Sequence, residues 1–200
     1  MNFQALFSHH AGIQSWLPFY RNTLRDHSDI PSKNLYRKKQ KKRHKVQVTD
    51  DLYLRTKYLE EMKEEIVDSP LLDSIYYKYS DLPFYMFKEY IEGRYGQRMD
   101  MLVDKEYYQP IGASSLGYLP LGEVNADQIV PSEIDDYYRH TEIQGYVHDM
   151  GAAMQNGVGG HAGLFSNAND VAKVMQMFMQ GGSYGGQQFF LPSTISHFNK

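Results

Sequence analysis

The chain contains no cysteine among its 200 residues. Disulfide bonds and thiolate metal sites are therefore excluded, and cysteine usage says nothing about the redox compartment. No apolar run approaches the roughly 18 residues of a membrane span, and the segment that starts at Met1 lacks the basic and apolar regions of a signal peptide. We therefore expect a soluble chain with no membrane segment and no signal peptide. Internal repeats are also absent, while a hydrophobic content of 42% suffices for a sizeable core.

Basic residues are scarce outside one segment. Lys33 to Lys45 holds eight of the 21 lysines and arginines and no acidic residue, which leaves 13 basic against 24 acidic side chains elsewhere. Clustered Lys and Arg can bind phosphate backbones, but like charges also repel one another and keep a loop extended and solvated. The segment has one aromatic residue and no Gly-rich or RNP-like pattern follows it. We therefore predict a mobile basic insertion at about 26–48 and no nucleic-acid partner.

Apolar spacing predicts four helices. A three-four spacing is followed by Leu52, Arg55, Leu59, Met62 and Ile66, which predicts a helix over about 51–67 that is capped by Thr49 or Asp50. A second helix is expected from Asp81, with Pro83 in its first turn, to Gly93 or Gly96, and a third over 99–108, before Pro110. The last is expected to start at Ser166 or Asn167 and to end at Gly181-Gly182. Residues 109–147 are expected to be largely irregular.

Three segments carry motifs. They are Leu6-Phe7-Ser8-His9-His10-Ala11-Gly12-Ile13, then Tyr79-Ser80-Asp81, and, about eighty residues later, Gly159-Gly160-His161-Ala162-Gly163-Leu164-Phe165-Ser166. In this order and spacing they resemble the β-lactamase-related serine hydrolases, the superfamily of penicillin-recognising enzymes and class C β-lactamases. The resemblance covers nearly the whole chain apart from the basic insertion. It implies an α+β, β-lactamase/transpeptidase-like fold, of which this chain would form mainly the helical lobe and the cleft border, as one partial domain over 1–200.

Tyr79 is the candidate catalytic residue, because the resemblance implies a tyrosine at a helix mouth that relays protons for a serine nucleophile. A free phenol has a pKa of about 10, so this role requires positive potential from a helix N-terminus and a nearby cation. Asp81 departs from the Tyr-x-Asn of many relatives, and its charge would oppose the phenolate. Tyr79 could instead be one of the 17 tyrosines, packed above a capped helix.

The remaining candidates are motif or cleft-lining positions rather than catalytic groups. They are Ser80, Asp81, His148, Asp149, Gly160, His161 and Gly163. His148-Asp149 is similar to a pair in large envelope-associated bacterial members, some of them fused to a family-three glycoside hydrolase, and it could form a structural dyad or line a pocket. Ser166 lacks the Gly-x-Ser-x-Gly elbow of a nucleophile and is expected to cap a helix. Histidine spacings typical of metal sites are absent, so we expect no metal and no cofactor.

The sequence has neither Ser-x-x-Lys nor, after residue 166, Lys-Thr-Gly or His-Thr-Gly. We therefore expect part of a serine hydrolase that acts on an ester, amide or β-lactam through an acyl-enzyme and is inactive alone. The alternative is a non-catalytic binding or scaffolding module derived from the same fold. The resemblance implies a small-molecule or peptidoglycan-like substrate for the full-length protein and a periplasmic or envelope location.

Overall fold

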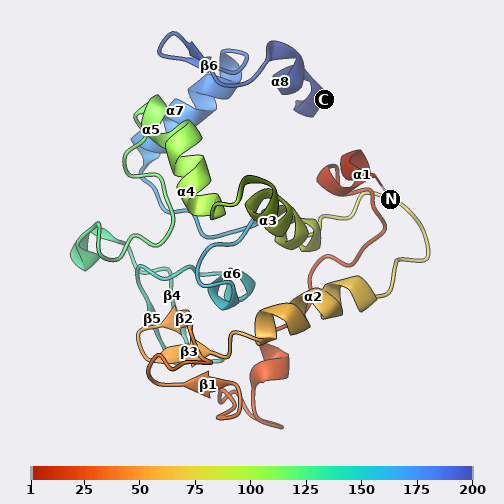
Figure 1. The fold of residues 1–200 in the computed structure, drawn as a ribbon, viewed down its shortest axis with the longest axis vertical. Coiled ribbons are helices and arrows are strands. Elements are labelled where there is room, and N and C mark those ends of the chain that lie inside the picture. The colour runs from red at the N-terminus through yellow and green to blue at the C-terminus, as the bar shows by residue number, and fades with distance from the viewer. Residues whose placement is uncertain (1, 200) are drawn as a thin grey trace.

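The computed structural model describes residues 2–199, which form an α+β fold of short helices around small antiparallel sheets (Figure 1). The α-helices are α1 (Phe3–Phe7), α2 (Tyr58–Asp68), α3 (Leu82–Tyr95), α4 (Met99–Val103), α5 (Gln109–Ile111), α6 (Met150–Met154), α7 (Ala168–Met179) and α8 (Pro192–Phe198). The strands are β1 (Tyr36–Arg37), β2 (Val46–Thr49), β3 (Leu52–Leu54), β4 (Glu133–Asp135), β5 (Thr141–Ile143), β6 (Ser183–Tyr184) and β7 (Gln187–Gln188). Two 3₁₀-helices, η1 (Arg21–Thr23) and η3 (Ala126–Gln128), and one π-helical turn, η2 (Asp104–Tyr108), complete the helical elements of the described residues.

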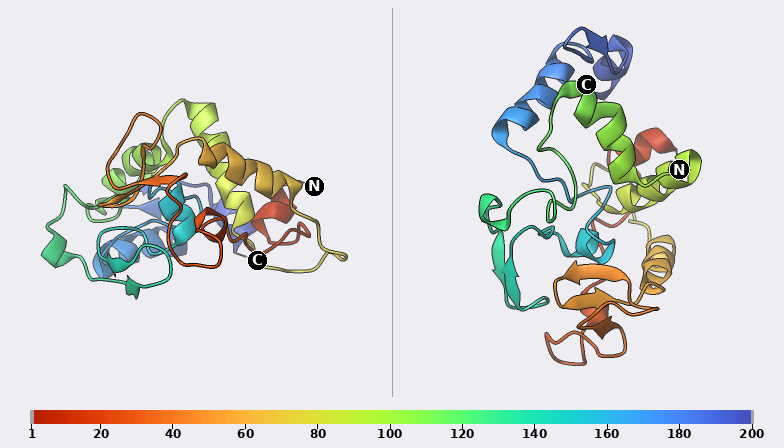
Figure 2. Two further views of the ribbon diagram at one scale, coloured as in Figure 1. Left: turned by 90° about the horizontal axis from the view of Figure 1, so that it is seen from below. Right: turned by 60° about the vertical axis from the view of Figure 1, so that its left-hand side comes forward.

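The molecule is elongated, and α3 and α6 lie in its middle. In Figure 1 the strands β1 to β5 gather at one end, whereas α5, α7, β6 and α8 gather at the other. The right-hand view in Figure 2 shows the same separation. The main core is built around Phe19, Leu54, Met62, Leu82 and Tyr138, all almost fully buried. No helix between residues 2 and 199 is long and apolar enough to cross a bilayer.

The sheet β1-β3-β2 corrects two expectations about its part of the chain. Leu54 pairs with Tyr36 on one side and with Val46 on the other, so residues 52–54 are a strand. The helix predicted over 51–67 is α2, which begins only at Tyr58. Thr49 accordingly ends a strand instead of capping a helix. Pairing with two partners outweighs the helical spacing because it buries Leu54 completely.

The insertion predicted at about 26–48 supplies β1 and most of β2, the two outer strands of this sheet. Tyr36 in β1 and Val46 in β2 are both buried, while the lysines between these two residues in the sequence are exposed. This anchoring at both ends was not expected from the sequence. The mobility of the exposed part stays a prediction.

The other helices agree with their local signals, with two differences. Residues 99–111 are continuously helical through the π-helical turn η2, so Pro110 lies inside the last turn and the helix stops at Gly112, whose φ is 75°. The widened turn before Pro110 accommodates a residue that lacks a backbone N–H. Helix α7 is capped by Asn167, whose Oδ1 accepts from Asp170 N at 3.0 Å, and not by Ser166, whose hydroxyl donates to the Asn167 carbonyl.

Candidate functional site

Helix α3 starts at a serine that ties two parts of the chain together. Ser80 is fully buried, and its Oγ accepts from Leu82 N at 3.2 Å while donating to the Gln14 carbonyl at 2.6 Å. Asp81 occupies the capping position, as expected, but its backbone is already helical and its side chain makes no capping bond. Ser80 therefore does the capping, and the Asp81 carboxylate is left for other contacts.

Tyr79 lies just before this helix end. Its side chain is 57% exposed, and its ring centre is 4.5 Å from that of His9. Partial burial and the neighbouring carboxylate of Asp81 raise the pKa of Tyr79 above that of an ordinary phenol. Within this chain the phenol is therefore accessible but protonated, and a nearby cation would be needed to make it a base.

Asp149 and His161 form the best-defined polar contact of the region. His161 Nε2 donates to Asp149 Oδ1 at 2.9 Å, and the same oxygen accepts from Ala152 N at 2.7 Å, which caps α6. Burial alone would raise the pKa of Asp149, but the bond from His161 and the backbone amides lower it below its ordinary value. The imidazole is 3% exposed and stacks on Tyr85 with 4.4 Å between ring centres.

The glycine-rich segment packs directly on the start of α3. A Cβ at Gly160 would lie 2.1 Å from the Phe84 carbonyl oxygen, and one at Gly163, where φ is 121°, would lie 2.6 Å from the Gly157 carbonyl oxygen. Only glycine allows these approaches. The expected close backbone contact is therefore present, and it brings His161 to the face of α3 that carries Tyr85.

His148 does not pair with Asp149. The His148 side chain is 55% exposed and lies 3.7 Å from Glu133, so the two neighbours do not form the dyad that was one interpretation of the sequence. Its backbone carbonyl instead accepts from Arg139 Nη2 at 2.7 Å. The same buried guanidinium reaches Asp135 at 2.5 Å and the Val147 carbonyl at 2.7 Å. Arg139 thereby fixes the segment that leads into Asp149.

Asp81 and Asp149 share a pocket of about 250 Å³ with four aromatic side chains. The structure thus brings Asp81 and Asp149 together, and it adds His161, which is hydrogen-bonded to Asp149. Tyr79 lies at the edge of this group, beside Asp81, whereas His148 contacts Glu133.

Sequence reasoning missed Tyr85 and Arg139. Tyr85 could have been found, because it lies four residues after Asp81 and so on the same face of the helix. No local pattern marks Arg139. Residues 2–199 contain no group of three His, Asp or Glu side chains that could hold a metal.

Comparisons with known proteins identify relatives and a fold. No family model matches the chain. A protein of Escherichia coli O157:H7 named "Putative D-alanyl-D-alanine carboxypeptidase" is 34% identical over 132 residues, which are 60% of this chain and 30% of the relative. A protein of the same name from Salmonella agona strain SL483 is 31% identical over 134 residues, 61% of this chain and 31% of the relative. The chain spans about three tenths of the length of these relatives.

A solved structure described as a "putative beta-lactamase" from Bacteroides dorei DSM 17855 superposes with a TM-score of 0.51 at 17% identity, covering 96% of this chain and 40% of that one. A match at this low sequence identity supports a similar fold and nothing further. The structural match and the mixture of helices and small sheets agree with the fold that the motifs imply. The chain has an α+β fold of the β-lactamase and penicillin-binding-protein type.

Proposed function

We propose that this chain forms the helical lobe and one border of the cleft of a serine hydrolase that cleaves an ester, amide or β-lactam bond through an acyl-enzyme. The observation that carries the proposal is the meeting of two motifs at one helix end: Tyr79 precedes α3, and Gly160 packs on its first turn. The names of the relatives support a peptidoglycan-like substrate ending in D-alanyl-D-alanine and a location in the bacterial envelope. Fusion to a family-three glycoside hydrolase domain rests on the sequence resemblance alone.

In this proposal Tyr79 takes the proton of the attacking serine hydroxyl and passes it to the leaving group. Its pKa is raised by burial and by Asp81, so the phenol needs a cation before it can accept a proton near neutral pH. The lysine of a Ser-x-x-Lys segment would supply that charge as well as the adjoining nucleophile. No such segment occurs among the 200 residues, and we expect residues 1–200 alone to be inactive.

A non-catalytic binding module is the second candidate. It is favoured by Asp81, which departs from the Tyr-x-Asn pattern of the family that the motifs resemble and opposes ionisation of Tyr79. The two candidates differ in whether a nucleophile acts beside Tyr79. The reading frame around the chain decides this most cheaply: an upstream Ser-x-x-Lys and a downstream His-Thr-Gly support the hydrolase, and their absence supports the binding module.

The biochemical test uses a fluorescent penicillin and a p-nitrophenyl ester. Residues 1–200 alone should show neither labelling nor turnover, while a chain that joins them to Ser-x-x-Lys and His-Thr-Gly segments should show both. In that longer chain Tyr79→Phe should lower turnover by about 10²–10⁴-fold, the usual scale for general acid-base catalysis. Tyr77→Phe is the matched control, because Tyr77 is similarly exposed two residues away. Undiminished turnover of Tyr79→Phe would remove Tyr79 from the mechanism.

A further inference from the structure

The pocket beside the start of α3 combines aromatic walls with negative charge. It has a volume of about 250 Å³, and its lining includes Trp16, Phe19, Tyr20, Tyr85, Asp81 and Asp149. Phe19, Tyr20 and Tyr85 are almost buried, whereas Trp16 is 51% exposed and stands at the rim. The Tyr85 hydroxyl lies where a Cβ on Gly151 would be, 1.8 Å from that position, so glycine is required for the ring to sit in this wall.

The two carboxylates in this pocket are not neutralised by lysine or arginine. No Lys or Arg of the described chain lines the pocket, and Asp81 makes no ion pair with another side chain between residues 2 and 199. Asp149 pairs with His161, which is not part of the pocket lining. Burial raises the pKa of Asp81 and Asp149 adds to the effect, although His161, His9 and a hydrogen bond from Tyr79 oppose it. A half-buried anion without a counter-ion is unfavourable, and a cation placed between the carboxylates would relieve it.

The aromatic walls favour the same kind of ligand. A cation over the face of an aromatic ring is attracted by the electron-rich face of the ring, and aromatic cages are a general way to bind organic ammonium ions. A hydrated metal ion would instead need several oxygen ligands, and no group of three suitable side chains exists in the described chain. The chemistry of the lining therefore selects an organic cation.

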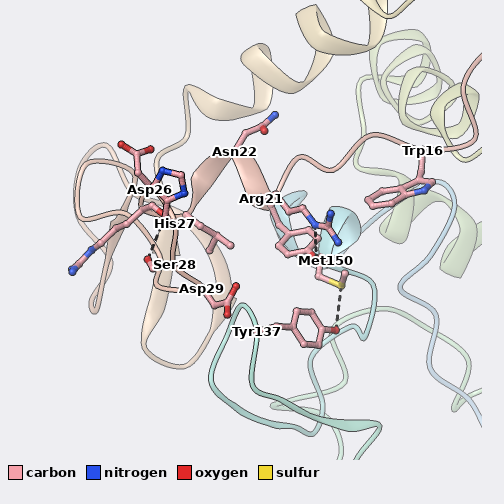
Figure 3. Close-up of a pocket in the computed structure, with 12 residues that line it drawn as sticks. Trp16, Arg21, Asn22, Asp26, His27, Ser28, Asp29, Tyr137 and Met150 are labelled. Carbon is pink, nitrogen blue, oxygen red and sulfur yellow. Dashed lines mark hydrogen bonds between the residues drawn. The ribbon is translucent and has the colours of Figure 1, made fainter.

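The pocket also has room for the rest of such a ligand. It shares Trp16, Tyr20 and Met150 with a larger hollow of about 950 Å³ that is bordered by the loop over residues 21–29 (Figure 3). That hollow presents charges of both signs, with Arg21 and Asp29 among them. An extended ligand can place its positive end in the pocket and its body along the hollow.

We propose that this pocket binds the primary ammonium group of a small organic amine or of an amino-acyl compound, held between Asp81 and Asp149 against the aromatic walls. The proposal concerns binding by this chain and does not depend on hydrolysis. If the ligand is a substrate, the site would select compounds that carry a free amino group.

Trp16 is the only tryptophan of the chain, so its fluorescence reports directly on the rim of the pocket. The probes are cyclohexylmethylammonium, its neutral analogue cyclohexylmethanol and the anion cyclohexanecarboxylate. None of them absorbs light at the wavelengths that excite tryptophan. The ammonium should change the Trp16 emission in a saturable way, and titration calorimetry should give the same Kd. Cyclohexylmethanol should bind at least tenfold more weakly, and the carboxylate should not bind.

Asp81→Asn removes the charge while keeping the shape and should weaken ammonium binding at least tenfold without changing the binding of the alcohol. Asp73→Asn, at an exposed acidic residue outside the pocket, is the matched control and should bind like the unchanged chain. Circular dichroism checks that each variant is folded, and Trp16→Ala, measured by calorimetry, is a second test at an exposed position. Equal affinity for ammonium and alcohol, or unchanged affinity in both Asp81→Asn and Trp16→Ala, would overturn the proposal.

Discussion

Asp149 and His161 meet through a single carboxylate oxygen that also caps a helix. Oδ1 of Asp149 accepts from His161 Nε2 at 2.9 Å and from Ala152 N at 2.7 Å. The loop after α6 and the start of α6 are therefore joined at one atom. Losing that oxygen removes a helix cap and leaves the buried imidazole without its partner.

We accordingly expect Asp149→Ala to lower the free energy of unfolding by about 2 kcal/mol, the sum of a typical cap and one hydrogen bond. Asp149→Asn keeps an oxygen that can cap α6 and should lose less than half as much. Urea unfolding followed by circular dichroism measures both variants. Equal losses would mean that the charge, and not the cap, carries the stabilisation.

Arg139 should be the most sensitive charged residue of the chain. Its guanidinium is fully buried between Asp135 and the Val147 and His148 carbonyls. Arg139→Met leaves the buried Asp135 carboxylate without its cationic partner and should lower the free energy of unfolding by about 3–5 kcal/mol. Arg98→Met breaks the partly exposed pair with Asp100 and should cost at most about 1 kcal/mol. The same denaturant titration compares the two variants.

Asp170 should make stability depend on acid pH. Hydrogen bonds from Lys173 and then from Ser115 lower the pKa of Asp170 to about 2. Because the folded pKa lies below the unfolded value of about 3.8, its contribution is fully present above pH 4 and is lost as the pH falls toward 2. Asp170→Asn should therefore flatten the fall of the urea midpoint over this window. A curve as steep as that of the unchanged chain would contradict the assigned pKa.

The helices α3 and α7 and the glycine-rich turn could be predicted because their signals are local: Pro83 in a first turn, Gly181-Gly182 after a last turn, and glycines where the backbone must approach closely. Strand β3 could not, because Leu54 is held by partners in two other strands while its own neighbours follow a helical spacing.

The same distinction applies to the candidate site. The motifs identified Asp81, Asp149 and His161 as residues of interest, but the choice of His161 over His148 as the partner of Asp149 depends on how the glycine-rich turn packs on α3. The aromatic pocket depends on a loop near residue 16 meeting helices from residues 85 and 150. No spacing within one segment encodes such contacts.

Trypsin should cut the basic segment first. Lys38 to Lys42 are exposed between two anchored strands, and their like charges oppose a compact arrangement. Limited digestion followed by mass spectrometry should therefore place the first cleavages there, with helix α3 intact. First cuts within residues 83–95 would show that the basic segment is better protected than its charge suggests.

The contact between Gly160 and α3 can be tested with a pair of identical substitutions. A Cβ at Gly160 would lie 2.1 Å from the Phe84 carbonyl oxygen, which is backbone of the first turn of α3 and cannot swing aside. Gly160→Ala must therefore push the glycine-rich turn away from α3, and a loss of about 1–3 kcal/mol is expected, the usual cost of overpacking. A Cβ at Gly93, within the same helix, would meet no atom within 4 Å, so Gly93→Ala should instead stabilise by up to about 1 kcal/mol through helix propensity. Thermal and urea unfolding of the two variants should thus shift in opposite directions. If Gly160→Ala were as stable as Gly93→Ala, the turn would not be packed against α3, and the joining of Tyr79 and His161 in one site would lose its structural basis.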